Sequence, residues 1–124
     1  MDNGELIMKE NVIKAKSFAF ALRVVKLGQY LTGQKKEFVL SKQVLRSGTA
    51  IGALVREAEQ AESKADFVHK MAIALKEANE TEYWIALLHQ SGYIDDTAFE
   101  SIQPDIVELL KLLTAIIKTT RAKP

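Results

Sequence analysis

The absence of proline from the first 103 residues is the feature that most limits what this chain can fold into. Proline lacks a backbone N–H and breaks helix interiors, so a chain without it can form long helices. Hydrophobic residues make up 48% of the 124 residues, which is enough to build a core in one domain. Because these residues recur at steps of three and four, the sequence predicts an all-α protein.

Four segments carry this helical spacing, over residues 11–32, 41–59, 64–91 and 96–120. The first has an apolar stripe formed by Ile13, Phe20, Val24, Leu27 and Leu31, and Phe18, Leu22 and Val25 widen this stripe. Connections of a few residues join helices that lie next to each other and run in opposite directions. We therefore expect a single domain over residues 1–124, an antiparallel up-down-up-down four-helix bundle.

Residues typical of helix N-termini precede three of these segments. Ser41 and Ser63 are expected N-caps, and Asp66 follows Ser63 at the spacing of a reciprocal cap. Either Asp95 or Asp96 is expected to cap the last helix.

Glycine and proline mark further points along the helices. Gly33 and Gly92 are expected to end helices in the left-handed conformation. Pro104 is expected either to kink the last helix or to begin its regular part.

Gly48 and Gly52 lie one turn apart inside the second predicted helix. A glycine in a helix interior costs about 1 kcal/mol relative to alanine, so a compensating contact is expected. A phosphate-binding loop is one alternative, but no Lys-Ser or Lys-Thr follows the glycines and no strand pattern precedes them. We favour close packing of a neighbouring helix against the two glycines.

The chain offers little for metal or cofactor chemistry. It has no cysteine, which excludes disulfides, thiolate ligands and thiol nucleophiles. A di-iron bundle needs two Glu-x-x-His motifs, whereas Asp66 precedes His69 by three residues and Ala86 stands before His89. We expect neither a metal site nor a cofactor.

Two acids and an aromatic residue share one side of the third predicted helix, namely Glu77, Glu80 and Trp84. Two carboxylates in a dry pocket can perform acid–base catalysis, but the chain supplies no nucleophile to complete such a site. Ion pairing with basic residues of the second helix is favoured, and it would set helix register or a subunit contact. The expected structural or interface residues are Arg46, Gly48, Gly52, Arg56, Glu57, Glu77, Glu80 and Trp84.

The formal charge of +1 conceals an uneven distribution. Between residues 11 and 36 there is no acid, and the basic residues are Lys14, Lys16, Arg23, Lys26, Lys35 and Lys36. This strip is a candidate for binding phosphate backbones, especially if several copies present it together. The alternative is an ordinary solvated helix face whose lysine stems cover apolar neighbours.

The last two predicted helices carry apolar residues outside their main stripes, among them Leu87, Leu110, Leu112 and Ile117. One bundle core does not accommodate all of them, so we expect self-association through these helices. The longest apolar stretch, residues 106–117, is interrupted by charges and is too short to span a bilayer. Acidic residues occupy the N-terminus where a signal peptide needs basic ones, so a cytoplasmic location and no membrane contact are expected.

A family resemblance emerges from the second and third predicted helices. The segments that carry it are residues 43–53 (QVLRSGTAIGA), 56–58 (REA), 63–67 (SKADF) and 74–84 (ALKEANETEYW). They resemble the bacterial proteins encoded in intervening sequences of 23S ribosomal RNA genes, a family that is sometimes labelled ribosomal. The resemblance implies an antiparallel four-helix bundle that assembles into a ring, with pentamers expected, and it implies no enzymatic activity.

That family is in turn similar to the accessory variability protein of diversity-generating retroelements, a basic barrel that binds nucleic acid and a reverse transcriptase. We therefore expect a non-enzymatic, self-assembling bundle that acts as an adaptor or as a nucleic-acid-binding accessory protein, with RNA or DNA contacting the basic strip. The alternative is a protein-interaction scaffold with no nucleic-acid role.

Overall fold

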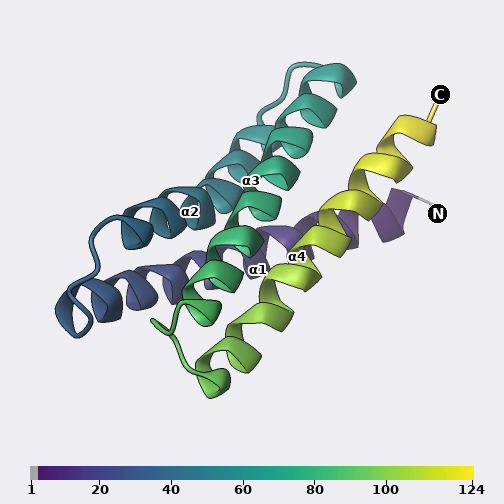
Figure 1. Ribbon diagram of the computed structural model, residues 1–124. Coiled ribbons are helices and arrows are strands. Elements are labelled where there is room, and N and C mark those ends of the chain that lie inside the picture. The colour runs from purple at the N-terminus through teal and green to yellow at the C-terminus, as the bar shows by residue number, and fades with distance from the viewer. Residues whose placement is uncertain (1–2) are drawn as a thin grey trace.

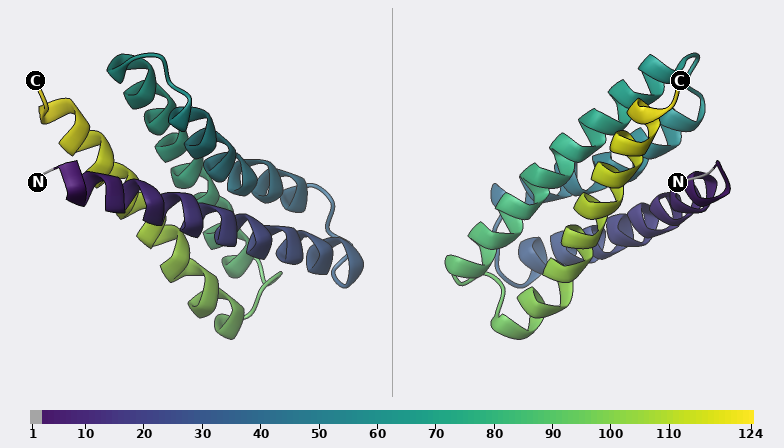
Figure 2. Two further views of the ribbon diagram at one scale, coloured as in Figure 1. Left: turned by 180° about the vertical axis from the view of Figure 1, so that it is seen from behind. Right: turned by 90° about the vertical axis from the view of Figure 1, so that its right-hand side faces the viewer.

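The computed structural model describes residues 3–124, which form four helices (Figure 1). These are α1 (Asn3–Gly33), α2 (Leu40–Glu59), α3 (Lys64–Gln90) and α4 (Asp96–Ala122). The α1–α2 and α3–α4 connections lie at one end of the molecule, whereas the α2–α3 connection and the outer ends of α1 and α4 lie at the other (Figures 1 and 2). The prediction of an all-α, up-down-up-down four-helix bundle is confirmed.

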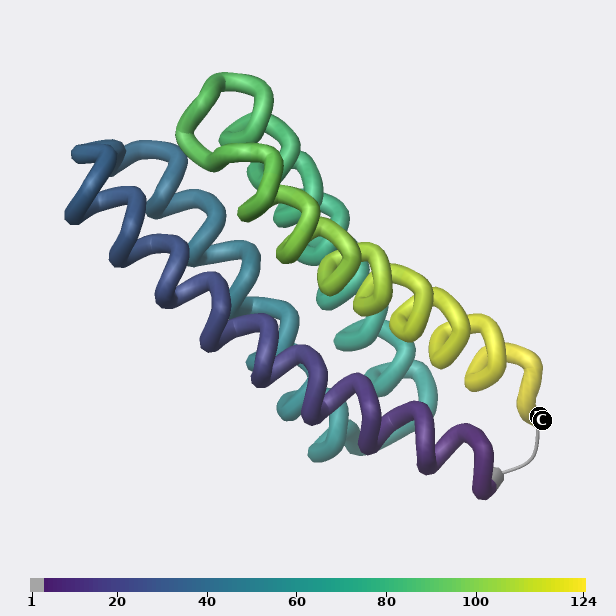
Figure 3. Tube along the Cα trace, turned by 90° about the horizontal axis from the view of Figure 1, so that it is seen from below, coloured from purple at the N-terminus to yellow at the C-terminus, as the bar shows by residue number. Residues whose placement is uncertain are grey.

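Each helix packs against its two neighbours around one core. α1 contacts α2 and α4, and α3 contacts the same two helices. Viewed from below, α1 and α2 run side by side, and so do α3 and α4 (Figure 3). The buried core draws on all four helices and includes Phe20, Val24, Val44, Ile51, Met71, Ile85, Ile106 and Leu113.

α1 begins at Asn3, well before the predicted start at residue 11. Leu6 is only 5% exposed and extends the buried stripe of α1 by two turns beyond Ile13. Burial of an apolar side chain stabilises a helical turn that propensity alone would leave frayed, and this explains the longer helix.

The helix starts were predicted in part. Ser63 caps α3 by accepting a hydrogen bond from the Asp66 N–H at 3.0 Å, and Asp95, rather than Asp96, caps α4 through the Ala98 N–H at 2.8 Å. The prediction for Ser41 was wrong, because Ser41 lies inside α2 and is buried.

The carboxylate of Glu37 caps α2 in place of Ser41. It accepts the Ser41 N–H at 2.8 Å and the Val39 N–H at 3.3 Å. A negative charge at this position also suits the positive end of the helix dipole.

Gly92 has a φ of +85°, as predicted for a residue that follows a helix in the left-handed region. Gly33 does not, so that prediction was wrong. Lys36, three residues later, adopts a positive φ of 54° and turns the chain toward α2.

Pro104 lies inside α4, two turns after its start, so it does not begin the helix. Its missing N–H leaves the Glu100 carbonyl without the usual helical donor, and the ring disturbs the preceding turn. The neighbouring carbonyl of Ser101 accepts a hydrogen bond from Arg23 of α1 at 2.9 Å, which supplies a donor at this turn.

Gly48 and Gly52 face α1 at close range. A Cβ atom added to Gly48 would lie 2.8 Å from a methyl carbon of Val24, and one added to Gly52 would lie 3.3 Å from the backbone oxygen of Ser17. On the other side of α2, the buried Thr81 hydroxyl of α3 lies 2.8 Å from the buried Ser47 hydroxyl. Small residues therefore let α2 approach both of its neighbours.

Candidate functional site

The basic residues predicted as a phosphate-binding strip fall into two groups in the structure. Acids of α2 and α4 pair with three of them: Lys14 with Glu59 at 3.2 Å, Lys16 with Glu108 at 3.0 Å, and Arg23 with Asp105 at 2.6 Å. These acids neutralise the local charge, so half of the strip is a set of bridges from α1 to its neighbours rather than an unpaired basic surface.

Arg23 is the most constrained of the three. Besides the ion pair with Asp105, its guanidinium donates to the Ser101 carbonyl at 2.9 Å and to the Ser101 hydroxyl at 2.8 Å. A planar guanidinium with several donors fits such a cluster, and here it joins α1 to the turn of α4 that precedes Pro104.

Four lysines lie toward the end of the bundle at which α1 and α2 are connected. We call this group the basic end, and it consists of Lys26, Lys35, Lys36 and Lys42. Among residues 3–124, no ion pair joins any of these four to an acid. The ammonium group of Lys35 lies 6.0 Å from the ring centroid of Tyr30, which is 41% exposed. The structure thus combines unpaired cations and an accessible aromatic ring at this end.

A second surface is apolar and lies along α1 and α2. We call it the α1–α2 face, and its members with their exposed fractions are Phe18 (50%), Leu22 (52%), Val25 (40%), Phe38 (61%) and Leu45 (38%). The three residues of α1 are spaced by four and three positions, so they share one side of the helix.

This result corrects the prediction that surplus apolar surface lies on the last two helices. Leu110 and Leu112 pack against the core, and Ile117 is 5% exposed. Within residues 3–124, Tyr83 (59% exposed) is the one large hydrophobic residue of α3 or α4 that is exposed. The core is larger than the predicted stripes, because neighbouring helices on both sides cover the flanks of α3 and α4.

A groove of about 370 Å³ runs across the α1–α2 face. Val25, Phe38 and Leu45 line it, together with Gly28, where a missing side chain leaves space. At the far end of the face, the Arg56 guanidinium lies 5.3 Å from the ring centroid of Phe18. Arg56 was expected to pair with the acids of α3, but it contacts Phe18 instead.

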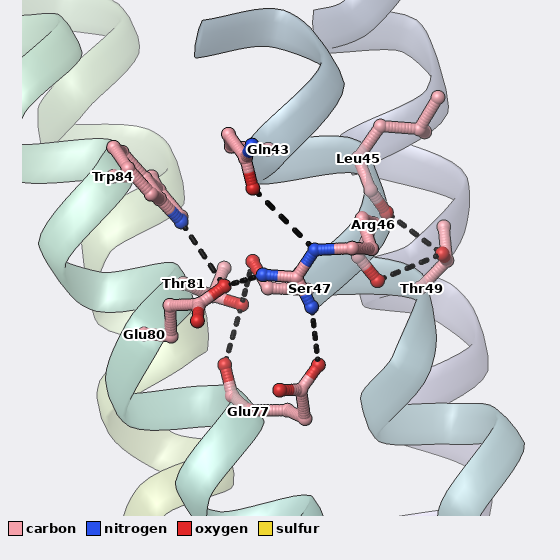
Figure 4. Close-up of polar contacts among 9 residues, drawn as sticks. All are labelled: Gln43, Leu45, Arg46, Ser47, Thr49, Glu77, Glu80, Thr81 and Trp84. Carbon is pink, nitrogen blue, oxygen red and sulfur yellow. Dashed lines mark hydrogen bonds and ion pairs between the residues drawn. The ribbon is translucent and has the colours of Figure 1, made fainter.

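Arg46 connects α2 to α3 through both acids singled out from the sequence (Figure 4). It donates to Glu77 at 3.1 Å and to Glu80, and the Trp84 indole donates to the same Glu80 carboxylate at 3.2 Å. Both carboxylates in this cluster accept hydrogen bonds, so the cluster is an ion-pair network. It is not a pair of carboxylates arranged for acid–base catalysis. Glu57, in contrast, lies exposed on α2 outside it.

The two histidines lie apart. His89 pairs with Asp96 at 2.7 Å and stacks on Phe99 with ring centroids 4.0 Å apart, whereas His69 is exposed on α3. Over residues 3–124, no group of three or more His, Cys, Asp or Glu side chains is placed to hold a metal ion.

At the opposite end of the bundle, partial burial raises the pKa of Glu10. Lys123 opposes this shift and the negative charge of Glu59 reinforces it.

Among the helices of residues 3–124, none has an apolar stretch long enough to span a lipid bilayer.

The sequence reasoning missed Phe38 and Tyr30 as surface residues and assigned Phe18, Leu22 and Val25 to a widened core stripe. The signal was present in part, because these three residues form their own i, i+4, i+7 series beside the series of Phe20, Val24 and Leu31. Two parallel apolar stripes show that a helix has two apolar sides, and the contacts with neighbouring helices decide which of them is buried.

Comparisons with known proteins identify relatives. A search of curated proteins found no match. A crystal structure of a protein of unknown function from the S23 ribosomal protein family of Bacteroides thetaiotaomicron is 59% identical and superposes with a TM-score of 0.87. The match covers 89% of this chain and 98% of that one. The 23S rRNA-intervening sequence protein family matches residues 9–115, and the chain belongs to this family.

Proposed function

We propose that the protein is a non-enzymatic, self-assembling accessory protein that binds nucleic acid through the basic ends of several copies. The observation that carries this proposal is the α1–α2 face, where five large apolar side chains are each at least 38% exposed and three of them, Val25, Phe38 and Leu45, line a groove. A contiguous apolar patch of this kind on a small protein marks an interaction site. The occupant we assign is a second copy of the chain.

A closed ring requires that two different surfaces of neighbouring copies meet. The α1–α2 face supplies one surface. For the other we propose the exposed side of α3 around Tyr83, whose ring meets the Trp84 ring edge-on at 5.0 Å. Five copies, the number that the family resemblance implies, would close such a ring.

A mixing experiment tests this pairing. Leu22→Glu removes the α1–α2 face and Tyr83→Glu removes the α3 surface, so each variant alone is expected to be monomeric. A mixture contains one intact surface of each kind and is expected to form a dimer of one copy of each variant. If both variants stay monomeric when mixed, α3 is not the complementary surface.

Assembly places the basic ends of all copies around one rim, because cyclic symmetry repeats every local feature. Several weak phosphate sites on one rim add up to useful affinity. An RNA or DNA partner suits the four lysines of the basic end, none of which has an ion-pair partner among residues 3–124. Binding to ribosomal RNA would place the protein in the cytoplasm.

A salt titration of RNA and DNA binding tests the rim. Replacing Lys35 and Lys36 by glutamine is expected to weaken binding and to flatten the plot of log affinity against log salt by about 0.7–0.9 for each lost phosphate contact. The matched control replaces Lys14 and Lys16 by glutamine. Because Glu59 and Glu108 already pair with those lysines, this control is expected to leave the slope unchanged.

A protein-interaction scaffold is the second candidate. It is favoured by the pairing of Lys14, Lys16 and Arg23 with acids, which removes half of the predicted basic strip. If the intact oligomer binds neither RNA nor DNA at low salt, the scaffold is the remaining function.

A further inference from the structure

A cavity lies between α1 and the first turns of α4, beside the basic end. Its volume is about 630 Å³, within the range of roughly 300–1,000 Å³ typical of small-molecule sites. Its position follows from the topology, since the α1–α2 and α3–α4 connections lie at the same end of the bundle (Figures 1 and 2).

The walls of this cavity combine three kinds of side chain. Leu27, Ile94 and Ile102 line it with apolar atoms, and Tyr30 adds a partly exposed aromatic ring. Thr97 and Ser101 of α4 add hydroxyl groups to the lining. A lining that combines apolar side chains, an aromatic ring and hydroxyl groups suits a planar, heteroatom-rich group such as a nucleobase.

The charged groups around the cavity have different availability. Arg23 is held by Ser101 and Asp105, and the Asp95 carboxylate accepts the Ala98 N–H at 2.8 Å, so both act as fixed walls. Lys26 lines the cavity without an ion-pair partner among residues 3–124, and Lys35 lies over the Tyr30 ring. A phosphate would therefore be attracted to the α1 side of the opening and repelled by Asp95 on the α4 side.

We propose that this cavity binds one unpaired nucleotide of a single-stranded nucleic acid. The base enters between the apolar wall and Tyr30, and the adjoining phosphate lies near Lys26 and Lys35. This inference rests on the proposed nucleic-acid function and names the form of nucleic acid, because a base inside a duplex would first have to be flipped out at a cost in free energy.

The test compares one labelled single strand of about ten nucleotides, a length within the site sizes of single-strand binders, with the blunt-ended duplex that it forms with its complementary strand, at the same salt. The native protein is expected to bind the single strand at least about tenfold more tightly, because only its bases can stack on Tyr30 without unpairing.

Tyr30→Leu removes the ring and is expected to weaken single-strand binding by about five- to a hundredfold while leaving duplex binding unchanged. The matched control, Tyr30→Phe, keeps the ring and is expected to bind within about twofold of the native protein, since only the hydroxyl is lost. Methyl NMR signals of Ile94 and Ile102 report occupancy directly, and they are expected to shift on addition of the single strand and not of the duplex.

The outcomes separate the two proposals. Equal binding of single strand and duplex, with Tyr30→Leu unchanged and the isoleucine signals unmoved, overturns the cavity and leaves nucleic-acid binding intact. No binding of either form overturns both.

Discussion

Replacing Gly48 by alanine tests how closely α1 and α2 approach. The new Cβ would lie 2.8 and 2.9 Å from the two methyl carbons of Val24, closer than such atoms pack. Val24 is fully buried and β-branched, so its methyl groups cannot rotate away without a second clash. The helices must therefore separate or Val24 must leave its rotamer.

Two opposing contributions determine how much Gly48→Ala changes the free energy of unfolding. Overpacking a core costs about 1–3 kcal/mol, and replacing glycine by alanine in a helix interior gains about 1 kcal/mol. The expected net effect of Gly48→Ala is a loss of about 0–2 kcal/mol in the free energy of unfolding. Gly28→Ala in α1 is the matched control, because its new Cβ would lie 4.0 Å from the nearest atom of Leu45, an ordinary contact.

Urea unfolding of both variants in the Leu22→Glu background, in which the proposed assembly does not form, measures the two free energies. Gly28→Ala is expected to gain about 0.5–1 kcal/mol, so the difference between the variants isolates the overpacking term of about 1–3 kcal/mol. Val24→Ala in the Gly48→Ala background should cost less than Val24→Ala alone, since the two sites are in contact. If Gly48→Ala stabilises the protein as much as Gly28→Ala does, the close approach is refuted.

Three further predictions concern polar and ionisable side chains. Thr81→Val leaves the buried Ser47 hydroxyl without its partner and is expected to cost about 1–3 kcal/mol, measured by urea unfolding; an unchanged midpoint would contradict the contact. Glu80→Gln weakens the pairing with Arg46 and is expected to lower stability by about 0.5–1 kcal/mol, and unchanged melting and unchanged assembly together would count against a structural network. Burial raises the pKa of Glu10 above 4.5, so the folded protein keeps the Glu10 carboxyl protonated to a higher pH than the unfolded chain does. As the pH rises above 4.5, ionisation of Glu10 therefore lowers the free energy of unfolding. The free energy of unfolding of Glu10→Gln should therefore increase relative to the native protein between acidic pH and pH 7, and a constant difference would show that Glu10 titrates alike in both states.

Features that depend on local sequence were predictable. The caps at Ser63 and Asp95 and the left-handed Gly92 each depend on residues within one turn of the chain. The start of α2 could not be predicted in the same way, because Glu37 caps this helix and glutamate is rarer than serine as a helix cap. Tertiary burial of Leu6 likewise decided where α1 begins.

The candidate surfaces depended on which helices become neighbours. Lys16 is a basic residue in an acid-free stretch of sequence, and only the contact of α1 with α4 shows that Glu108 neutralises it. In the same way, the spacing of Leu22 shows that it shares a side with Phe18, but not whether that side is buried. Charge and apolar pattern along one helix predict a surface only after the topology assigns its partners.

The mass of the assembly in solution tests the central claim most directly. Light scattering on the native protein should give a multiple of the 13.8 kDa chain mass, five copies if the ring closes as proposed. Leu22→Glu should reduce the mass to that of one chain while leaving the helical content unchanged. Thr114→Glu, which adds the same charge at an exposed position of α4, should keep the native mass. A native protein that is monomeric, or a Leu22→Glu variant that assembles like the native protein, would contradict self-assembly through the α1–α2 face.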